Sequence, residues 1–268
     1  MSRIKATLEG IKQRGEKGLI TFLTAGDPDL STSAQLIHSL VEGGVDLIEL
    51  GVPFSDPMAD GPTIQAASER ALASGATLHG VLELVHDVRR YTNIPLVLMG
   101  YYNPVLQYGP ERFAADASAA GVDGLLLVDL PPEEAEELHP WLRNAGIDLI
   151  TLLAPTTAEP RRSQLAAAAE GFLYYVSMTG VTGSQRVDAG AIKQEVELLR
   201  KLSPVPVAVG FGVSTAEDAR AIASFADAVV VGSALVRLIA EHGASPRLYD
   251  EVRAFAADLK GAVSQTSP

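Results

Sequence analysis

The sequence predicts a single-domain (β/α)8 TIM barrel that spans residues 1–268. Eight short apolar runs lack polar–apolar alternation, which is typical of parallel strands buried on both faces. Helical segments separate these runs, and repeated strand–helix alternation is the pattern of the barrel. The length of 268 residues, a hydrophobic content of 47% and the lack of a linker suit one large domain. A doubly wound open sheet is the alternative architecture.

The elements follow in order along the chain. Residues 1–17 are expected to hold an extra N-terminal helix, because Ile4, Leu8 and Ile11 follow helical spacing. The predicted strands occupy residues 19–23, 47–50, 95–99, 123–128, 147–152, 171–176, 205–209 and 227–231. The predicted helices occupy residues 31–42, 62–73, 77–91, 132–145, 188–201, 214–223 and 248–259, with two more that begin after Thr156 and at Ser233. Residues 262–268 are expected to fray.

Hydroxyl side chains mark several of the predicted helix starts. Ser31 or Ser33 is the expected N-cap of the helix at 31–42. The segments 156–159 and 214–217 each match a capping box, in which a Ser or Thr is followed three residues later by Glu.

Two loops are longer than the rest. The interval between strand starts is 49 residues from 46 to 95 and 34 residues from 171 to 205. Extra length after a barrel strand lies on the catalytic face, where the βα loops gather. The loops after the second and sixth strands are therefore expected to be extended there, and their glycines make them candidates for lids.

Two carboxyl groups flank the first of these loops. Glu49 lies in the second strand on the same face as Leu47, whereas Asp60 lies in the following proline- and glycine-containing loop. A buried carboxylate is unfavourable unless it is paired or its pKa rises, and two acids in unlike surroundings are suited to separate acid and base roles. The competing interpretations are a salt-bridged strand residue for Glu49 and a turn residue for Asp60.

Composition excludes several classes of function. The net charge of −12 argues against nucleic acid and anionic membrane surfaces as partners. The absence of cysteine excludes disulfides, thiol catalysis and cysteine-ligated metals. The N-terminus lacks the apolar core of a signal peptide and the chain has no run of 18 apolar residues, so a cytoplasmic protein is expected.

Glycines after the last two strands predict a phosphate site. Gly212 follows the seventh strand, and Gly232 and Ser233 join the eighth strand to a helix. Glycine lets a ligand approach the backbone closely, and a helix N-terminus presents free N–H groups. The loops after strands 7 and 8 are the frequent phosphate site of barrels, and Gly183 could close over them. Each glycine taken singly is also explained by a tight turn.

The predicted catalytic face lacks lysine and histidine. None of the six lysines lies at the carboxyl end of a predicted strand, which argues against Schiff-base chemistry. All five histidines fall on predicted helices or helix ends, so no metal site is expected. The remaining carboxyl, hydroxyl and apolar groups suit general acid–base chemistry on a phosphorylated, largely apolar substrate.

Several motifs resemble those of the tryptophan synthase alpha subunit family, and the match covers nearly the whole chain. They read ELGVPFSDPMADGPTIQAA, TAGDP, YYNPV, SMTGVTG and GFGVS. The resemblance implies cleavage of indole-3-glycerol phosphate to indole and glyceraldehyde 3-phosphate without a metal or other cofactor in this chain. By the same resemblance, Glu49 is the acid–base that protonates C3 of the indole ring. Asp60 bonds the indole N–H, and Thr182 contacts Asp60 in a closed lid.

The resemblance also assigns substrate-binding residues. These residues are Phe22, Tyr101, Asp129 and Phe211 as pocket lining, Tyr174 near the substrate, and Gly183, Gly212, Gly232 and Ser233 around the phosphate. Core packing explains Phe22 and Phe211 nearly as well, and the adjacent Tyr175 competes with Tyr174 for its position.

A partner is implied as well. Family members bind a beta subunit that carries pyridoxal phosphate, in an alpha2-beta2 heterotetramer, and indole passes through a tunnel between the subunits. Pro53, Asp56, Pro57, Asn103 and Pro104 are the interface candidates, although proline loops are also ordinary turns. The rival hypotheses are another phosphate-binding barrel enzyme and a catalytically idle binding or scaffold subunit.

Overall fold

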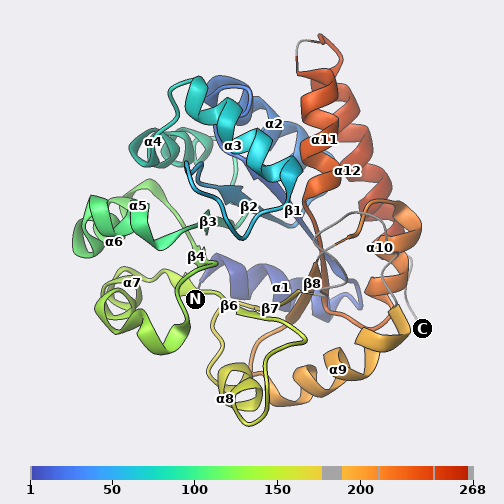
Figure 1. The fold of residues 1–268 in the computed structure, drawn as a ribbon. Helices are drawn as coiled ribbons and strands as arrows, with labels where there is room; N and C mark the ends of the chain where they lie inside the picture. The colour runs from blue at the N-terminus through green and yellow to red at the C-terminus, as the bar shows by residue number, and fades with distance from the viewer. Residues whose placement is uncertain (1, 177–188, 211, 244, 265–268) are drawn as a thin grey trace.

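The computed structural model describes residues 2–176, 189–210, 212–243 and 245–264. The described strands all run parallel in one sheet, in the order β5-β4-β3-β2-β1-β9-β8-β7-β6. Their bounds are β1 Gly18–Thr24, β2 Leu47–Gly51, β3 Leu96–Gly100, β4 Gly124–Leu127, β5 Asp148–Leu149, β6 Thr151–Leu153, β7 Leu173–Val176, β8 Val207–Gly210 and β9 Ala228–Val231. Figure 1 shows the helices arranged around this sheet, as the barrel prediction requires.

The fifth predicted strand is divided in two. β5 pairs with β4 and β6 pairs with β7, and the two short strands flank Ile150. The Ile150 N–H donates to the Leu125 carbonyl at 2.8 Å, so the chain crosses there from one neighbour to the other. β5 and β6, at the two ends of the strand order, are therefore joined through the chain itself, which makes the barrel nearly closed.

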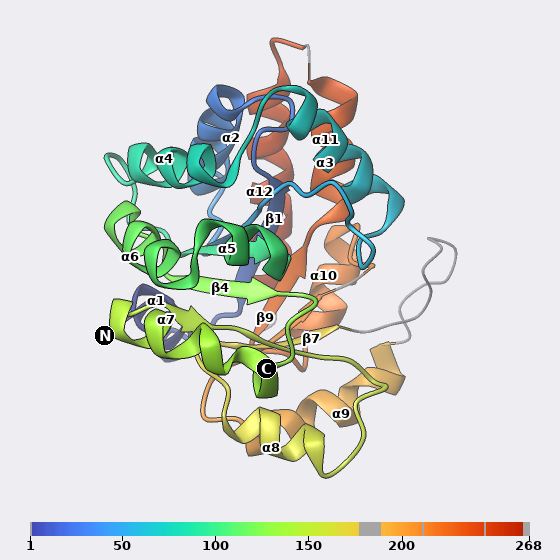
Figure 2. The same ribbon diagram turned by 60° about the vertical axis from the view of Figure 1, so that its left-hand side comes forward.

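The described helices cover the outside of the sheet, apart from α1. They are α1 Arg3–Gln13, α2 Leu30–Glu42, α3 Pro62–Ala73, α4 Leu78–Val88, α5 Tyr102–Tyr108, α6 Pro110–Ala120, η1 Pro132–Glu137, α7 His139–Ala145, α8 Arg161–Ala167, α9 Ala189–Leu202, α10 Ala216–Ala223, α11 Ser233–His242 and α12 Leu248–Ser264. The buried side chains of α1, Ile4, Leu8 and Ile11, pack with the strand residues that face the barrel interior. Figure 2 shows α1 beside the amino-terminal starts of the strands, so this helix closes that end of the barrel.

The observed helices differ from the predicted ones in number and in their bounds. Residues 132–145 form η1 and then α7 rather than one helix, because Pro140 has no N–H to continue the helical ladder. The helices α5 and α6, which follow the third strand, were not predicted. Helix α12 extends to Ser264 and buries Ala262 and Val263, so the expected tail at 262–268 starts too early. Residues 265–268 lie outside the described residues.

The predicted caps are displaced along the chain. Asp29, not Ser31 or Ser33, caps α2 by accepting the Thr32 N–H at 2.8 Å. A capping box does open α10, but one residue later than predicted, between Thr215 and Asp218. The segment 156–159 forms no capping box, since α8 begins after Pro160 and has no side-chain cap.

Carboxylates tie neighbouring strands together at the amino-terminal end of the barrel. Each precedes an even-numbered strand of the eightfold barrel and accepts the N–H of the first or second residue of the strand before it, at 2.7–3.2 Å. The pairs are Asp46 with Leu19, Asp123 with Leu96, Glu170 with Leu149 and Asp227 with Val207. Each acid also contacts a basic side chain; these are Lys260, Arg89, His139 and Arg200. Acids at the strand starts are thus fully partnered and structural.

Candidate active site

Glu49 lies in the middle of β2 and faces the barrel interior. Its Cα is paired with Phe22 of β1 and Val97 of β3. Leu47, two residues earlier, belongs to the interior cluster, whereas Ile48 and Leu50 pack in the outer layer against the helices. Glu49 thus shares a face with Leu47, as predicted, and the structure shows that this face is the barrel interior.

The carboxyl group of Glu49 is fully buried and has no partner. Its exposed fraction is 0%, and within the described part of the chain neither carboxyl oxygen has a hydrogen bond. Burial raises the pKa of Glu49 from 4.5 to about 8. Without a bonding or charged group to favour the anion, Glu49 is mainly protonated at neutral pH and can donate a proton.

Asp60 occupies a different setting in the loop between β2 and α3. The Tyr101 hydroxyl donates to Asp60 Oδ2 at 3.2 Å and accepts the Ala59 N–H at 2.9 Å. Gln65 holds the same loop by donating from Nε2 to the Asp60 carbonyl at 2.8 Å. Burial raises the pKa of Asp60, and the Tyr101 hydrogen bond opposes this by stabilising the carboxylate. The two acids are therefore in unlike surroundings, as the sequence indicated.

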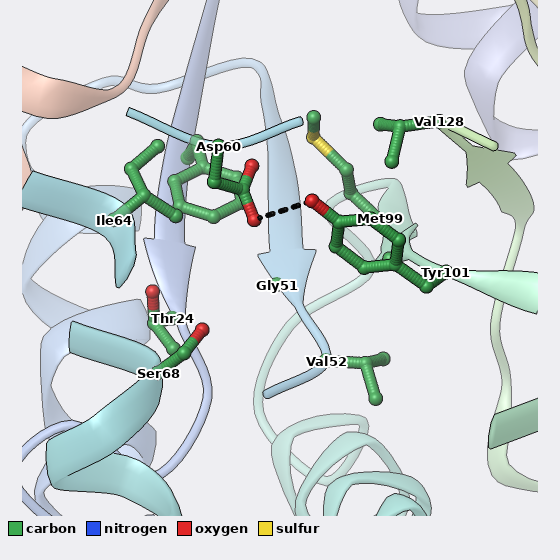
Figure 3. Close-up of a pocket in the computed structure, with 11 residues that line it drawn as sticks. Thr24, Gly51, Val52, Asp60, Ile64, Ser68, Met99, Tyr101 and Val128 are labelled. Carbon is green, nitrogen blue, oxygen red and sulfur yellow. Dashed lines mark hydrogen bonds between the residues drawn. The ribbon is translucent and has the colours of Figure 1, made fainter. Parts of the chain in front are cut away.

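A pocket opens beside Asp60 at the carboxyl ends of β1, β2 and β3. Its free interior volume is about 10 Å³, and the rest of the hollow is open to solvent. Figure 3 shows Asp60 and Tyr101 pointing toward one another at its wall. The lining residues are Phe22, Thr24, Gly51, Val52, Asp60, Ile64, Ser68, Met99, Gly100, Tyr101 and Val128. Glu49 is not among them.

The sequence interpretation missed most of this wall. Thr24 and Gly51 could have been found, because each lies two residues after a predicted site residue on the same strand face, Phe22 and Glu49. Ile64 and Ser68 come from α3, and no local pattern distinguishes them from helix residues that only pack.

The structure distinguishes the two neighbouring tyrosines. Tyr174 belongs to the interior cluster, and its pKa is raised well above the usual value by burial and then by the nearby Glu49 charge. Tyr175 packs in the outer layer. Tyr174 is thus the tyrosine on the Glu49 side of β7, and its hydroxyl lies against Gly210 of β8.

Asp129 has a contact that its sequence position did not predict. It is exposed, and its Oδ1 accepts the Tyr102 N–H at 2.8 Å at the start of α5. It does not line the pocket, although its neighbour Val128 does. The structure therefore shows Asp129 as a helix cap that joins the ends of β3 and β4.

The described residues of the predicted phosphate site follow adjacent strands. The pairing of Gly210 with Val230 brings Gly212 and Gly232 to the same level beyond β8 and β9. Gly212 has φ +76°, which favours glycine, and Ser233 is the first residue of α11, which has no side-chain cap. Thr182, Gly183 and Phe211 lie outside the described residues.

The interface candidates differ in exposure. Asp56 and Asn103 are exposed, and Pro57 and Pro104 are half-buried. Pro53 is buried, although an interface candidate is expected to be exposed. In the same loop Met58 is 85% exposed, which is unusual for a large apolar side chain and was not predicted.

No group of acidic, histidine or cysteine side chains in the described ranges could hold a metal ion. Among the helices that the structure describes, none is long and apolar enough to cross a membrane.

The fold and pocket define a (β/α)8-barrel enzyme of the acid–base type, with two carboxyl groups in contrasting environments at its carboxyl end. The family model of the tryptophan synthase alpha chain matches residues 8–264, and the chain belongs to this family. The tryptophan synthase alpha chain of Geobacter sulfurreducens is 54% identical over 98% of this chain and 99% of its own. That of Burkholderia pseudomallei is 51% identical over 98% of this chain and 97% of its own.

Solved structures agree with this assignment. Tryptophan synthase subunit alpha from Legionella pneumophila superposes with a TM-score of 0.91 at 40% identity, covering 98% of both chains. A tryptophan synthase structure from M. tuberculosis, in its aminoacrylate-bound form, gives 0.87 at 35% identity over 98% of this chain and 100% of that one.

The chain is therefore an alpha subunit in tryptophan biosynthesis. Its reaction is the lyase cleavage of indole-3-glycerol phosphate to indole and glyceraldehyde 3-phosphate. It pairs with a beta subunit, which holds the pyridoxal phosphate of tryptophan synthase, and itself needs no cofactor.

Proposed function

We propose that Glu49 and Asp60 are the catalytic residues of this cleavage. The carboxyl group of Glu49 protonates C3 of the indole ring, which creates a cationic ring. The bond from C3 to the glycerol carbon then breaks as the hydroxyl on that carbon loses its proton to Glu49. The products are indole and an aldehyde, and the proton count balances, with Glu49 protonated again.

The observation that carries this proposal is the buried, unpartnered carboxyl of Glu49. A pKa of about 8 leaves a proton available at neutral pH and makes the group a usable base once it has donated it. Asp60 supplies the complementary charge, because its carboxylate can accept the indole N–H and stabilise the cationic ring. The Tyr101 hydroxyl orients that carboxylate.

The remaining residues bind the substrate. Phe22 and Tyr101 form apolar walls for the indole ring, and Tyr174 lies on the Glu49 side of the barrel. Gly212, Gly232 and Ser233 bind the phosphate through backbone N–H groups, which is supported by the start of α11 after β9. The substrate-binding roles of four further residues are proposed from the family motifs alone; these residues are Asp129, Thr182, Gly183 and Phe211.

The assembly and location are also proposals. An alpha2-beta2 heterotetramer in the cytoplasm, docked through Asp56, Pro57, Asn103 and Pro104, would bring the pocket end toward the beta subunit. Asp56 and Pro57 belong to the loop after β2, and Asn103 and Pro104 to α5, which follows β3. The ends of these two strands line the pocket.

The test is indole release from indole-3-glycerol phosphate by Glu49→Gln and by wild type, each with the beta subunit present. The rate should fall by about 10²–10⁴-fold, which is the range for a positioned acid–base group. Glu69→Gln on the exposed surface of α3 is the matched control and should retain the wild-type rate. Retention of the rate by Glu49→Gln would refute the assigned role.

A further inference from the structure

Glu49 does not line the pocket in this structure. Asp60 and Tyr101 line the pocket, whereas Glu49 is 0% exposed and does not. A substrate ring that fills only this pocket therefore contacts Asp60 but not the group that should protonate it. Contact between such a ring and Glu49 requires a side chain at the pocket end of the barrel interior to move.

The ring of Phe22 occupies that place. Gly51 follows Glu49 by two residues on the interior face of β2, one step nearer the pocket end. A Cβ added at Gly51 would lie 2.6 Å from Phe22 Cζ and 2.8 Å from Cε2. The far edge of the ring therefore lies close against Gly51, one interior position beyond Glu49 toward the carboxyl end of β2, in space that a larger residue at position 51 would fill.

Phe22 is held there by few contacts. It is separate from the two large cores and packs with Ala67 of α3 and Val236 of α11, with Ile64 and Met99 beside it. It also lines the pocket. Because the free volume of the pocket is about 10 Å³, a shift of the ring requires the side chains that pack with it to adjust.

We infer that the Phe22 ring is a movable cover, which keeps Glu49 dry and out of reach until the substrate ring displaces it from Gly51. The cover extends the proposed role of Glu49 as the acid–base and rests on it. With the cover in place the carboxyl has no exposed surface, and this burial is the cause of its raised pKa. Once the ring moves, the same carboxyl meets the indole C3 and the glycerol hydroxyl.

Among the described residues, no charged side chain shifts the pKa of Glu49. The paired strands present Phe22 and Val97, which do not titrate, and from β7 the titratable neighbour is Tyr174. Asp60 lies on the pocket side. A change in Glu49 titration on altering Phe22 therefore reports water access rather than the loss of a charged partner.

Two variants remove the cover in different ways. Phe22→Leu shortens the ring to a side chain that covers Gly51 incompletely, and Gly51→Ala places a methyl group where the ring lies. Carbon-13 NMR of glutamate-labelled protein without substrate follows the Glu49 carboxyl, whose signal is the one lost in Glu49→Gln. In both variants the titration midpoint should fall from about 8 toward 4.5 by at least about one pH unit.

Phe113→Leu is the matched control, since Phe113 is also fully buried but packs in the outer layer away from Glu49. Its midpoint should equal that of wild type. The limb of the kcat/KM profile that reports Glu49 should move with the NMR midpoint in the two cover variants. The proposal that Phe22 covers Glu49 would be wrong if the Glu49 midpoint stays at the wild-type value in Phe22→Leu and Gly51→Ala. It would also be wrong if the midpoint falls in Phe113→Leu as much as in those two variants.

The two proposals can fail separately. If Glu49→Gln keeps its activity while the cover variants shift the Glu49 midpoint, the catalytic role fails and the cover stands. If Glu49→Gln is inactive and the midpoint does not move, the catalytic role stands and the cover is wrong.

Discussion

Replacement of Glu49 by glutamine should make the protein more stable, and increasingly so as pH rises. Glutamine keeps the size of the side chain but cannot ionise. The carboxyl of Glu49 has no hydrogen bond to lose in the described structure, so the exchange breaks no described contact. The expected gain comes only from removing a titration that differs between the folded and unfolded chains.

The magnitude follows from the raised pKa. The folded value is about 8 and the unfolded value is about 4.5. Below pH 4.5 both states hold the proton and the variant gains nothing. Between these values only the unfolded chain has released its proton, so wild-type stability falls by about 1.4 kcal/mol per pH unit. Above pH 8 both states are ionised, and the difference in the free energy of unfolding between variant and wild type stays at about 5 kcal/mol. This is an upper value, because water can enter the wild-type barrel.

The assay is urea unfolding of both proteins at steps from about pH 5 to about pH 9, with stability extrapolated to zero urea. The difference between Glu49→Gln and wild type should grow through this window and then level off. Glu241→Gln, at an exposed position on α11, should show a small difference that does not vary with pH. A Glu49→Gln difference that is constant across the window would refute the reasoning, because it would mean that Glu49 titrates alike in both states.

Two further predictions concern the neighbours of the two acids. Tyr101→Phe removes the hydroxyl that stabilises the Asp60 carboxylate, so the pKa of Asp60 rises further. The cleavage rate at neutral pH should fall about tenfold, since a hydrogen bond to a charged group contributes about 1.5 kcal/mol; an unchanged pH–rate profile would contradict this. Gly210→Ala should destabilise the fold by about 1–3 kcal/mol in urea unfolding, because the added methyl group meets the Tyr174 hydroxyl. Tyr174→Phe in the same chain removes that hydroxyl and should recover part of the loss, whereas no recovery would show that the collision lies elsewhere.

Local patterns predicted the parts of this protein that depend on neighbours along the chain. The period of two in β2 placed Glu49 on the interior face, and continuous apolar runs located the parallel strands. The predicted helix at 62–73 has the observed bounds of α3. These features are visible in sequence because strand alternation and helix initiation act over a few residues.

Other features were decided by contacts between distant segments. Asp46, Asp123 and Glu49 all lie in or next to apolar strands, yet Asp46 and Asp123 are tied to Lys260 and Arg89 and Glu49 is left without a partner. Strand pattern cannot distinguish them, because partners more than 30 residues away decide which acid is neutralised and which is only desolvated.

The pocket illustrates the same limit. Its wall combines strand ends with Ile64 and Ser68 of α3, and whether Phe22 packs over Glu49 depends on the absence of a side chain at Gly51 on the next strand. The sequence by itself determined the barrel, its catalytic end and the two acids. Only the tertiary structure decided that Glu49 is buried and without a hydrogen bond to any described residue, since enclosure requires side chains from several strands and helices to meet around one group.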